Sequence, residues 1–153
     1  MMSHAMDARI VRYGELQPCK TAFIDAHTPG SDQKENFTII GGGDQQQELK
    51  EFARLHPQTL SVYDPVPHEE IPERLAQAHI GALPFPDEEK FRVSSPIKLF
   101  EYIASGMLVV ATRIVCHTDV MGNAEYAFYI EGSDVPAMVT GLREIHQVKD
   151  KLP

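Results

Sequence analysis

The residues with the clearest capacity for chemistry lie in one stretch near the middle of the chain, FRVSSPIKLFEYIASGMLVVAT. Ser94 and Ser95 are residue types that cap helices, and Pro96 suits the first helical position, where its missing N–H would have no partner. Free N–H groups and the dipole of a helix N-terminus favour phosphate. The stretch therefore predicts a phosphate site beside Lys98 and Glu101, although those two are also spaced as an ordinary surface ion pair.

The residues after Pro96 predict the elements that hold this site. The buried face of the helix is expected to consist of apolar residues at helical spacing, namely Ile97, Phe100, Ile103 and Ala104. Gly106 is expected to end the helix in the left-handed conformation. The apolar run 108–111 then predicts a strand that is covered on both faces.

The whole chain alternates strands with helices, which predicts an α/β fold, a Rossmann-like doubly wound parallel sheet. Strands are expected over residues 8–13, 36–40, 59–63, 80–83, 108–111 and 126–130. Further helices are expected over residues 21–27, 45–55, 69–78 and 134–148, the second and the last capped by Asp44 and Asp134. The inner face of the last helix is expected to carry Met138, Leu142 and Ile145. Irregular segments are expected over 84–92 and 114–122. Residues 1–7 are expected to be a tag or a disordered segment, which leaves residues 8–153 as one domain.

Composition excludes several classes of function. The chain has 153 residues and a net charge of −8, which argues against nucleic acid as a partner. No apolar run reaches the roughly 20 residues that span a bilayer. Two distant cysteines, Cys19 and Cys116, favour a reducing, cytoplasmic location. The seven histidines show no ligand spacing, so neither a metal nor a cofactor is expected.

Ligands of such a sheet bind at the carboxyl ends of its strands, which gathers the loops 14–20, 41–44, 64–68 and 84–95 at one edge. The run GGGD at 41–44 does not fit a dinucleotide fingerprint, because the third glycine would fall at Gln46. A tight turn into a helix is the favoured interpretation, and the glycines would also let a ligand approach the backbone. The acidic run DEE at 87–89 is more typical of a solvated loop than of a carboxylate site.

The stretch VSSPIKLFEYIASGMLVVA resembles the signature S-P-x-K-x-x-E-Y-x-A-x-G-x-P-V-V of the C-terminal, donor-binding half of GT-B glycosyltransferases, of the glycosyltransferase family 4 type. The signature belongs to a bacterial branch that builds surface polysaccharides such as O-antigen. The segments VYDPVPHEEIPERLAQAHIGALPF and FTIIGGGD are similar to those before the signature, so the resemblance covers about residues 10–145.

This resemblance implies a retaining hexosyltransferase that needs no metal. It would move a sugar from a nucleotide-sugar, with a UDP-sugar expected, to a lipid-linked or polysaccharide acceptor. The acceptor-binding N-terminal half of such enzymes is missing here. We therefore expect an excised domain with that half as its partner and little activity alone. The full enzyme would be cytoplasmic, with peripheral association at the inner face of the plasma membrane as an option.

The resemblance also implies roles for single residues in the central stretch. Glu101 matches the second glutamate of the family's two-glutamate motif, which accepts hydrogen bonds from the donor ribose. Ser94, Ser95 and the N–H groups of Ile97 and Lys98 match the segment that cradles the diphosphate.

Other implied site residues lie elsewhere in the chain. Lys20 matches the lysine that neutralises the diphosphate, so Lys20 and Lys98 are the implied catalytic residues. Val66 lies where the family contacts the base, and Gly14 and Gly42 lie in the neighbouring donor-binding turns.

The chain also departs from the family pattern. The first motif glutamate would fall at Val93, so its role is either missing or met from the acidic run at 87–89. The arginine after the first-strand glycine is Glu15, and the proline before the Val-Val pair is Leu108. Two other functions stay open, namely a non-catalytic nucleotide-sugar-binding subunit and a regulatory, receiver-like or flavodoxin-like α/β module.

Overall fold

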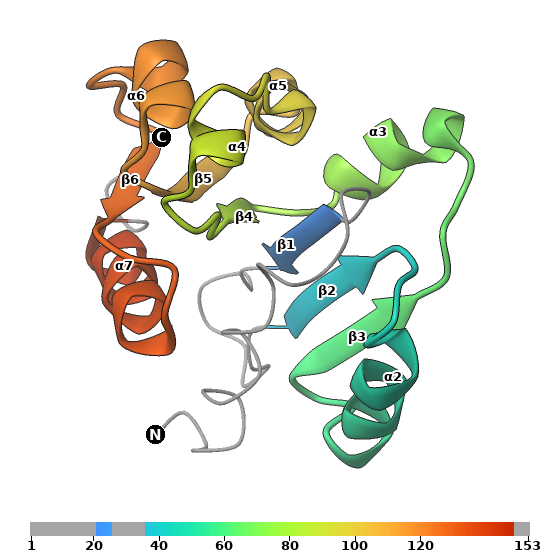
Figure 1. Cartoon of the computed structure of the whole chain (residues 1–153). Helices are drawn as coiled ribbons and strands as arrows, with labels where there is room; N and C mark the ends of the chain where they lie inside the picture. Colours follow the sequence, from blue (N-terminus) through green and yellow to red (C-terminus); the bar gives the residue numbers. More distant parts are fainter. Residues whose placement is uncertain (1–20, 26–35, 149–153) are drawn as a thin grey trace.

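The computed structural model describes residues 21–25 and 36–148, with side chains from residue 36 onward. Within these ranges the chain forms one six-stranded sheet with strand order β3-β2-β1-β4-β5-β6 and helices on both faces (Figure 1). The strands are β1 (Thr21–Asp25), β2 (Asn36–Ile40), β3 (Leu60–Tyr63), β4 (Ile80–Leu83), β5 (Leu108–Thr112) and β6 (Ala127–Ile130). The helices are α2 (Gln46–Leu55), η2 (His68–Glu70, a 3₁₀ turn), α3 (Ile71–Leu75), α4 (Glu89–Arg92), α5 (Ile97–Ala104), α6 (Val115–Met121) and α7 (Val135–Val148).

The direction of the strands decides where their loops meet. β2 pairs parallel to β3, and β4, β5 and β6 pair parallel to one another. Between these two blocks β1 runs antiparallel to both β2 and β4. Two reversals cancel, so β2 to β6 all point the same way and their carboxyl ends share one edge. The Rossmann-like α/β class is confirmed, with β1 as the antiparallel strand of the described sheet.

The helix predicted over residues 21–27 is wrong, because residues 21–25 form β1. Its segment, TAFID, combines a β-branched residue with an aromatic one and another β-branched residue, which favour strands. Pairing on both sides also gives the strand backbone partners that no local pattern could show. The strand predicted over residues 8–13 lies outside the described residues.

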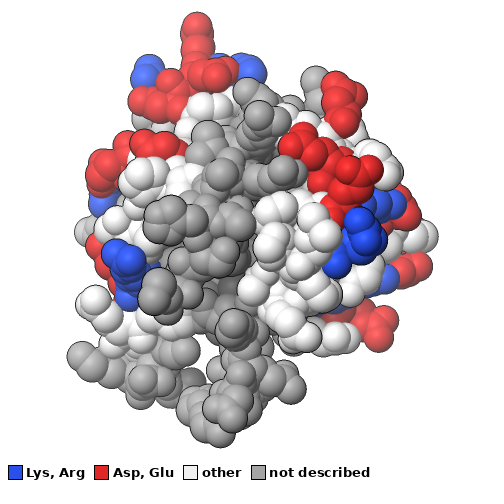
Figure 2. All heavy atoms as spheres, turned by 90° about the horizontal axis from the view of Figure 1, so that it is seen from below, with Lys and Arg blue, Asp and Glu red and all other residues white. Residues whose placement is uncertain are grey.

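Two apolar cores lie on opposite faces of the sheet. α2 and α7 cover one face, and α3, α4, α5 and α6 lie on the other (Figure 1). The predicted inner face of α7 is confirmed, because Met138, Leu142 and Ile145 are buried against the sheet. The other core includes Leu75, Leu99 and Tyr102, with residues of β4 and β5 between them. On the side seen in Figure 2, acidic side chains gather at the margins beside a few Lys and Arg atoms.

Two segments predicted to be irregular are helical. α4 is a single turn that buries none of its side chains. α6 fills most of the segment 114–122, because Ile114, His117 and Met121 are buried at helical spacing. The helix predicted over 69–78 is shorter, since a 3₁₀ turn at His68–Glu70 precedes α3.

The predicted inner face of α5 is wrong in part. Of its residues, Ile103 packs, partly buried, against the core. Ile97 and Phe100 are 66% and 48% exposed, whereas Leu99 and Tyr102 are fully buried. The reason lies in the strand beneath, because Gly81 of β4 leaves room for the Tyr102 ring. A Cβ atom at Gly81 would lie 2.2 Å from Cδ2 of that ring, so any side chain there would displace it. The helix ends as expected at Gly106, whose φ is +72°.

Candidate functional site

The turns after β2 and β3 are joined at the carboxyl edge of the sheet. Gln46 Nε2 donates hydrogen bonds of 2.9 Å to both the Gly41 carbonyl and Asp64 Oδ1. Lys50 Nζ lies 2.7 Å from the same carboxylate oxygen, and this contact lowers the pKa of Asp64. These contacts hold the turn after β2, which contains Gly42, against the turn after β3 that leads to Val66.

The N-terminus of α5 carries no side-chain cap. Pro96 is the N-cap residue and not the first helical residue. Its apolar ring has no atom that can accept a hydrogen bond from the helix N–H groups. Ser94 Oγ instead donates to the Phe91 carbonyl at 2.8 Å, so the predicted capping is wrong. The first N–H groups of α5, on Ile97 and Lys98, therefore face the carboxyl edge without a capping side chain.

Glu101 lies one turn further along α5 and is the most unusual carboxylate in the described chain. Its side chain is only 16% exposed, and neither oxygen accepts a hydrogen bond from the described residues. Two basic side chains flank it, at distances of less than 4 Å. Lys98 Nζ lies 3.4 Å from Oε2, and His68 Nδ1 of the 3₁₀ turn lies 3.8 Å from Oε1. Lone pairs of a buried carboxylate without a hydrogen-bond donor are costly unless a ligand supplies one.

The loop between β4 and α5 is held by exposed ion pairs. Arg92 makes two contacts with the Asp87 carboxylate, at 2.6 and 2.9 Å, which lower the pKa of Asp87. Lys90 Nζ lies 2.9 Å from Glu88. Val93 itself is 79% exposed. Two of the three acidic residues considered as substitutes for the missing glutamate are therefore already paired with cations.

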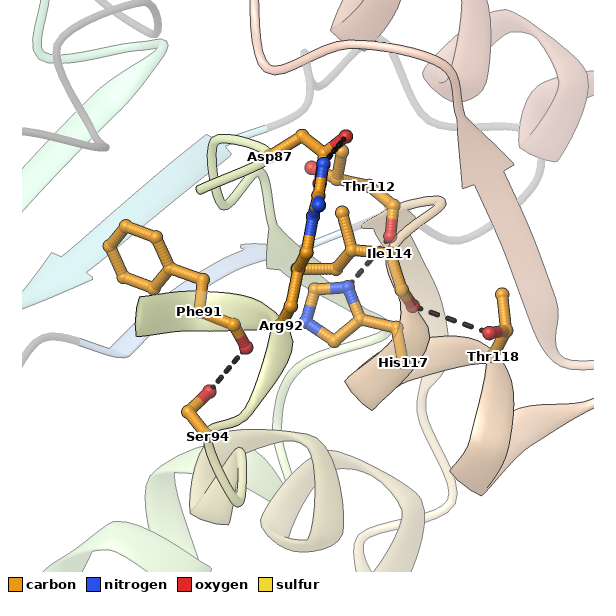
Figure 3. Close-up of polar contacts among 8 residues, drawn as sticks. All are labelled: Asp87, Phe91, Arg92, Ser94, Thr112, Ile114, His117 and Thr118. Carbon is orange, nitrogen blue, oxygen red and sulfur yellow. Dashed lines mark hydrogen bonds and ion pairs between the residues drawn. The ribbon is translucent and has the colours of Figure 1, made fainter. Parts of the chain in front are cut away.

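His117 is a polar group of this edge that its sequence pattern did not identify. It is fully buried in α6, and its Nδ1 lies 2.7 Å from the Thr112 carbonyl oxygen (Figure 3). Burial lowers the pKa of His117. Its ring lies 5.4 Å from that of Phe85, centroid to centroid. The histidines show no metal-ligand spacing, and this spacing was the only signal by which they were judged. The signal that identifies His117 is the helical spacing of Ile114, His117 and Met121.

The structure thus brings several of the predicted site residues to one edge of the sheet. Ser94, Ser95, Ile97, Lys98 and Glu101 lie on α5 or directly before it. Val66 and Gly42 lie in the joined turns after β3 and β2. Lys20 and Gly14 fall outside the described residues.

The described residues offer neither a metal site nor a membrane-spanning helix. No group of three His, Cys, Asp or Glu side chains among them is placed to hold a metal ion. None of their helices is both long enough and apolar enough to cross a membrane.

Comparison with known families gives a match that covers nearly the whole chain. Residues 9–147 match a protein-family model described as glycosyl transferases group 1. No curated protein matches the chain. The matched range contains every described strand and helix, apart from the last residue of α7.

Proposed function

The chain belongs to the group 1 glycosyltransferase family, and from this premise we propose that it is the donor-binding half of a GT-B enzyme. This half would bind a nucleotide-sugar, with a UDP-sugar as the first candidate. The full enzyme would retain the anomeric configuration and pass the sugar to a lipid-linked or polysaccharide acceptor in surface-polysaccharide synthesis. It would need the acceptor-binding half as a partner, and it would work in the cytoplasm or at the inner face of the plasma membrane.

The observation that carries this proposal is the state of Glu101. Two carboxylate oxygens side by side, buried and without hydrogen-bond donors from the described chain, match the two adjacent hydroxyl groups of a ribose. Lys98 Nζ and His68 Nδ1 lie 3.4 and 3.8 Å from the two oxygens, but neither makes a hydrogen bond to them. A ribose would therefore supply the donors that the folded chain withholds.

The neighbouring groups fit the rest of such a ligand. The uncapped N-terminus of α5 offers N–H groups to a diphosphate, and the helix dipole adds positive potential there. Lys98 would add positive charge as the diphosphate leaves, together with Lys20. Val66 lies beside the 3₁₀ turn that carries His68, which suits contact with the base.

The test is calorimetric titration of the chain with UDP, GDP and CMP in the presence of EDTA. We expect one of these nucleotides to bind without metal. Glu101→Ala should weaken that binding more than tenfold, because the ribose hydroxyls lose their acceptors. Glu144→Ala, which removes an exposed glutamate from α7 on the opposite face, is the matched control and should leave affinity unchanged.

Each result has a clear meaning. Equal affinity of the Glu101 variant and the parent would remove Glu101 from the site. Binding of none of the three nucleotides would contradict a complete donor site on this chain. Repeating the titration after adding the acceptor-binding half would then show whether that half completes the site.

A further inference from the structure

His117 has one nitrogen that is satisfied and one that is not. Nδ1 lies 2.7 Å from the Thr112 carbonyl oxygen, which can only accept, so the hydrogen of the neutral ring is on Nδ1. Nε2 is then a bare acceptor. It is buried and has no hydrogen-bond partner in the described part of the chain. A buried acceptor of this kind is costly unless a donor reaches it.

Two features keep this imidazole neutral. The side chain is fully buried, which disfavours the charged form. His117 also lies in the first turn of α6, where the positive end of the helix dipole opposes a second positive charge. A neutral acceptor of this kind suits a hydroxyl group and does not suit a phosphate oxygen, which has no hydrogen to donate.

The position of His117 relative to the other site residues suggests which hydroxyl. A nucleotide-sugar is linear, with base, ribose, diphosphate and sugar in that order. The turn to Val66 follows β3, and Glu101 and the N-terminus of α5 follow β4. α6 follows β5, further along the same edge, and the Cys116 thiol contacts Ser94 at the entry to α5. His117 therefore lies past the diphosphate position, on the side where the sugar would be.

We propose that His117 is a binding residue for the sugar of the donor, whose Nε2 accepts a hydrogen bond from a sugar hydroxyl. The proposal rests on the donor-binding function above. The acidic residues of the neighbouring loop, Asp87 and Glu88, are already paired with Arg92 and Lys90.

Few contacts hold the segment over the imidazole. Figure 3 shows the imidazole between Thr112 on one side and the segment with Arg92 and Ser94 on the other. α4 has no fully buried side chain, and its ion pairs are exposed, so each contributes little to stability. The Phe91 ring, which lies 5.1 Å from that of Phe85, centroid to centroid, is its apolar contact. A shift of residues 87–93 would open Nε2 to a ligand bound at Ser94 and Ile97.

The experiment compares a nucleotide with its sugar conjugate on the parent chain. The two ring nitrogens of His117 are followed by ¹⁵N NMR during titration with UDP, UDP-glucose, GDP and GDP-mannose. We expect the sugar conjugate to move the Nε2 resonance in the direction of an accepted hydrogen bond, while the matching nucleoside diphosphate leaves it in place. The Nδ1 resonance should stay unchanged, because its bond to Thr112 persists.

Two variants separate the nitrogens. His117→Asn keeps a donor near the Thr112 carbonyl and removes Nε2, and His117→Gln keeps an acceptor near the Nε2 position. The Asn variant should bind the sugar conjugate about tenfold more weakly and the nucleoside diphosphate equally well, with partial recovery in the Gln variant.

The outcomes separate this proposal from the donor-binding function. If both ligands bind and the Nε2 resonance does not move, the sugar role of His117 is overturned while the donor-binding function stands. If neither pair of ligands binds, even after the acceptor-binding half is added, both are overturned. Because the NMR arm uses the parent chain, its answer does not depend on the folding of the variants.

Discussion

Helices α7 and α5 pack on opposite faces of the same sheet and differ in how their ends and faces are satisfied. Asp134 caps α7, since its Oδ1 accepts a 2.9 Å hydrogen bond from the Ala137 N–H. The buried residues of α7 include the three that its pattern predicted. α5 has no side-chain cap, leaves Ile97 and Phe100 exposed, and buries a carboxylate without hydrogen-bond donors from the described chain.

The difference shows where this chain follows local rules and where it departs from them. The cap of α7, its apolar spacing and its buried residues are all as its sequence predicts, as expected of an element that only stabilises the fold. α5 lacks the predicted cap, exposes part of the face that was predicted to be buried, and buries a carboxylate without hydrogen-bond donors from the described chain. These departures cluster at the carboxyl edge of the sheet. Such departures are typical of functional sites, so the comparison itself supports a ligand at α5 and not at α7.

The largest expected difference between the two helices is in the loss of stability when an apolar side chain is removed from each. Leu142→Ala in α7 should cost about 2–5 kcal/mol, because a fully packed side chain leaves a cavity. Ile97→Ala in α5 should cost less than about 0.5 kcal/mol, since Ile97 is mostly exposed. Urea unfolding of both variants measures the difference. A loss at Ile97 comparable to that at Leu142 would mean that the predicted face of α5 is buried after all.

A smaller effect should come from pH, and it should act on the α5 side. Burial lowers the pKa of His117 below its usual 6.5, so below pH 6.5 the unfolded chain binds a proton that the folded chain does not. The contribution of neutral His117 to the free energy of unfolding is therefore complete above pH 6.5. It is lost as the pH falls toward the pKa of the folded state, by at most about 1.4 kcal/mol per pH unit.

Hydrogen exchange at pH 7.5 and 5.5 measures this effect by region. Amides of α6 should lose protection at the lower pH more than those of α7, whose core contains no buried titratable side chain among the described residues. The His117→Asn variant should lose this difference. Equal loss of protection in α6 and α7 would contradict a local role for His117.

The smallest expected effect on stability comes from the N-termini of α7 and α5. Asp134→Ala should cost about 1 kcal/mol by removing the cap of α7. Ser95→Ala should change the free energy of unfolding by no more than about 0.5 kcal/mol, because no serine caps α5. Thermal unfolding of the two variants is sufficient. A cost at Ser95 equal to that at Asp134 would show that Ser95 caps α5 in solution.

Much of the fold could be predicted because strong local signals agree with it. The glycine stop at Gly106, the cap at Asp134 and the apolar runs of β2, β4 and β5 each act within a few residues. The errors came from partners distant in sequence. β1 is a strand because β2 and β4 flank it. α5 turns Tyr102 inward because Gly81, 21 positions earlier, leaves room.

The site was predictable to a different degree. Ser94, Lys98 and Glu101 could be placed at one helix N-terminus from spacing alone. Nothing in the sequence showed that Glu101 would be buried beside His68, because the 3₁₀ turn reaches α5 only in the folded chain. His117 was missed because the segment 114–122 was predicted to be irregular, and its bare nitrogen is visible only in three dimensions.

The contact between Gly81 and Tyr102 has a consequence for the divergence of this family. Neither position can change freely, because a methyl group at 81 already collides with the ring at 102. Among relatives, a side chain at the first position should therefore appear only with a smaller residue at the second. Tyr102 directly follows Glu101, so the same pair sets the height of the carboxylate above the sheet. Covariation of these two positions would thus track the geometry of the proposed ribose site across the family.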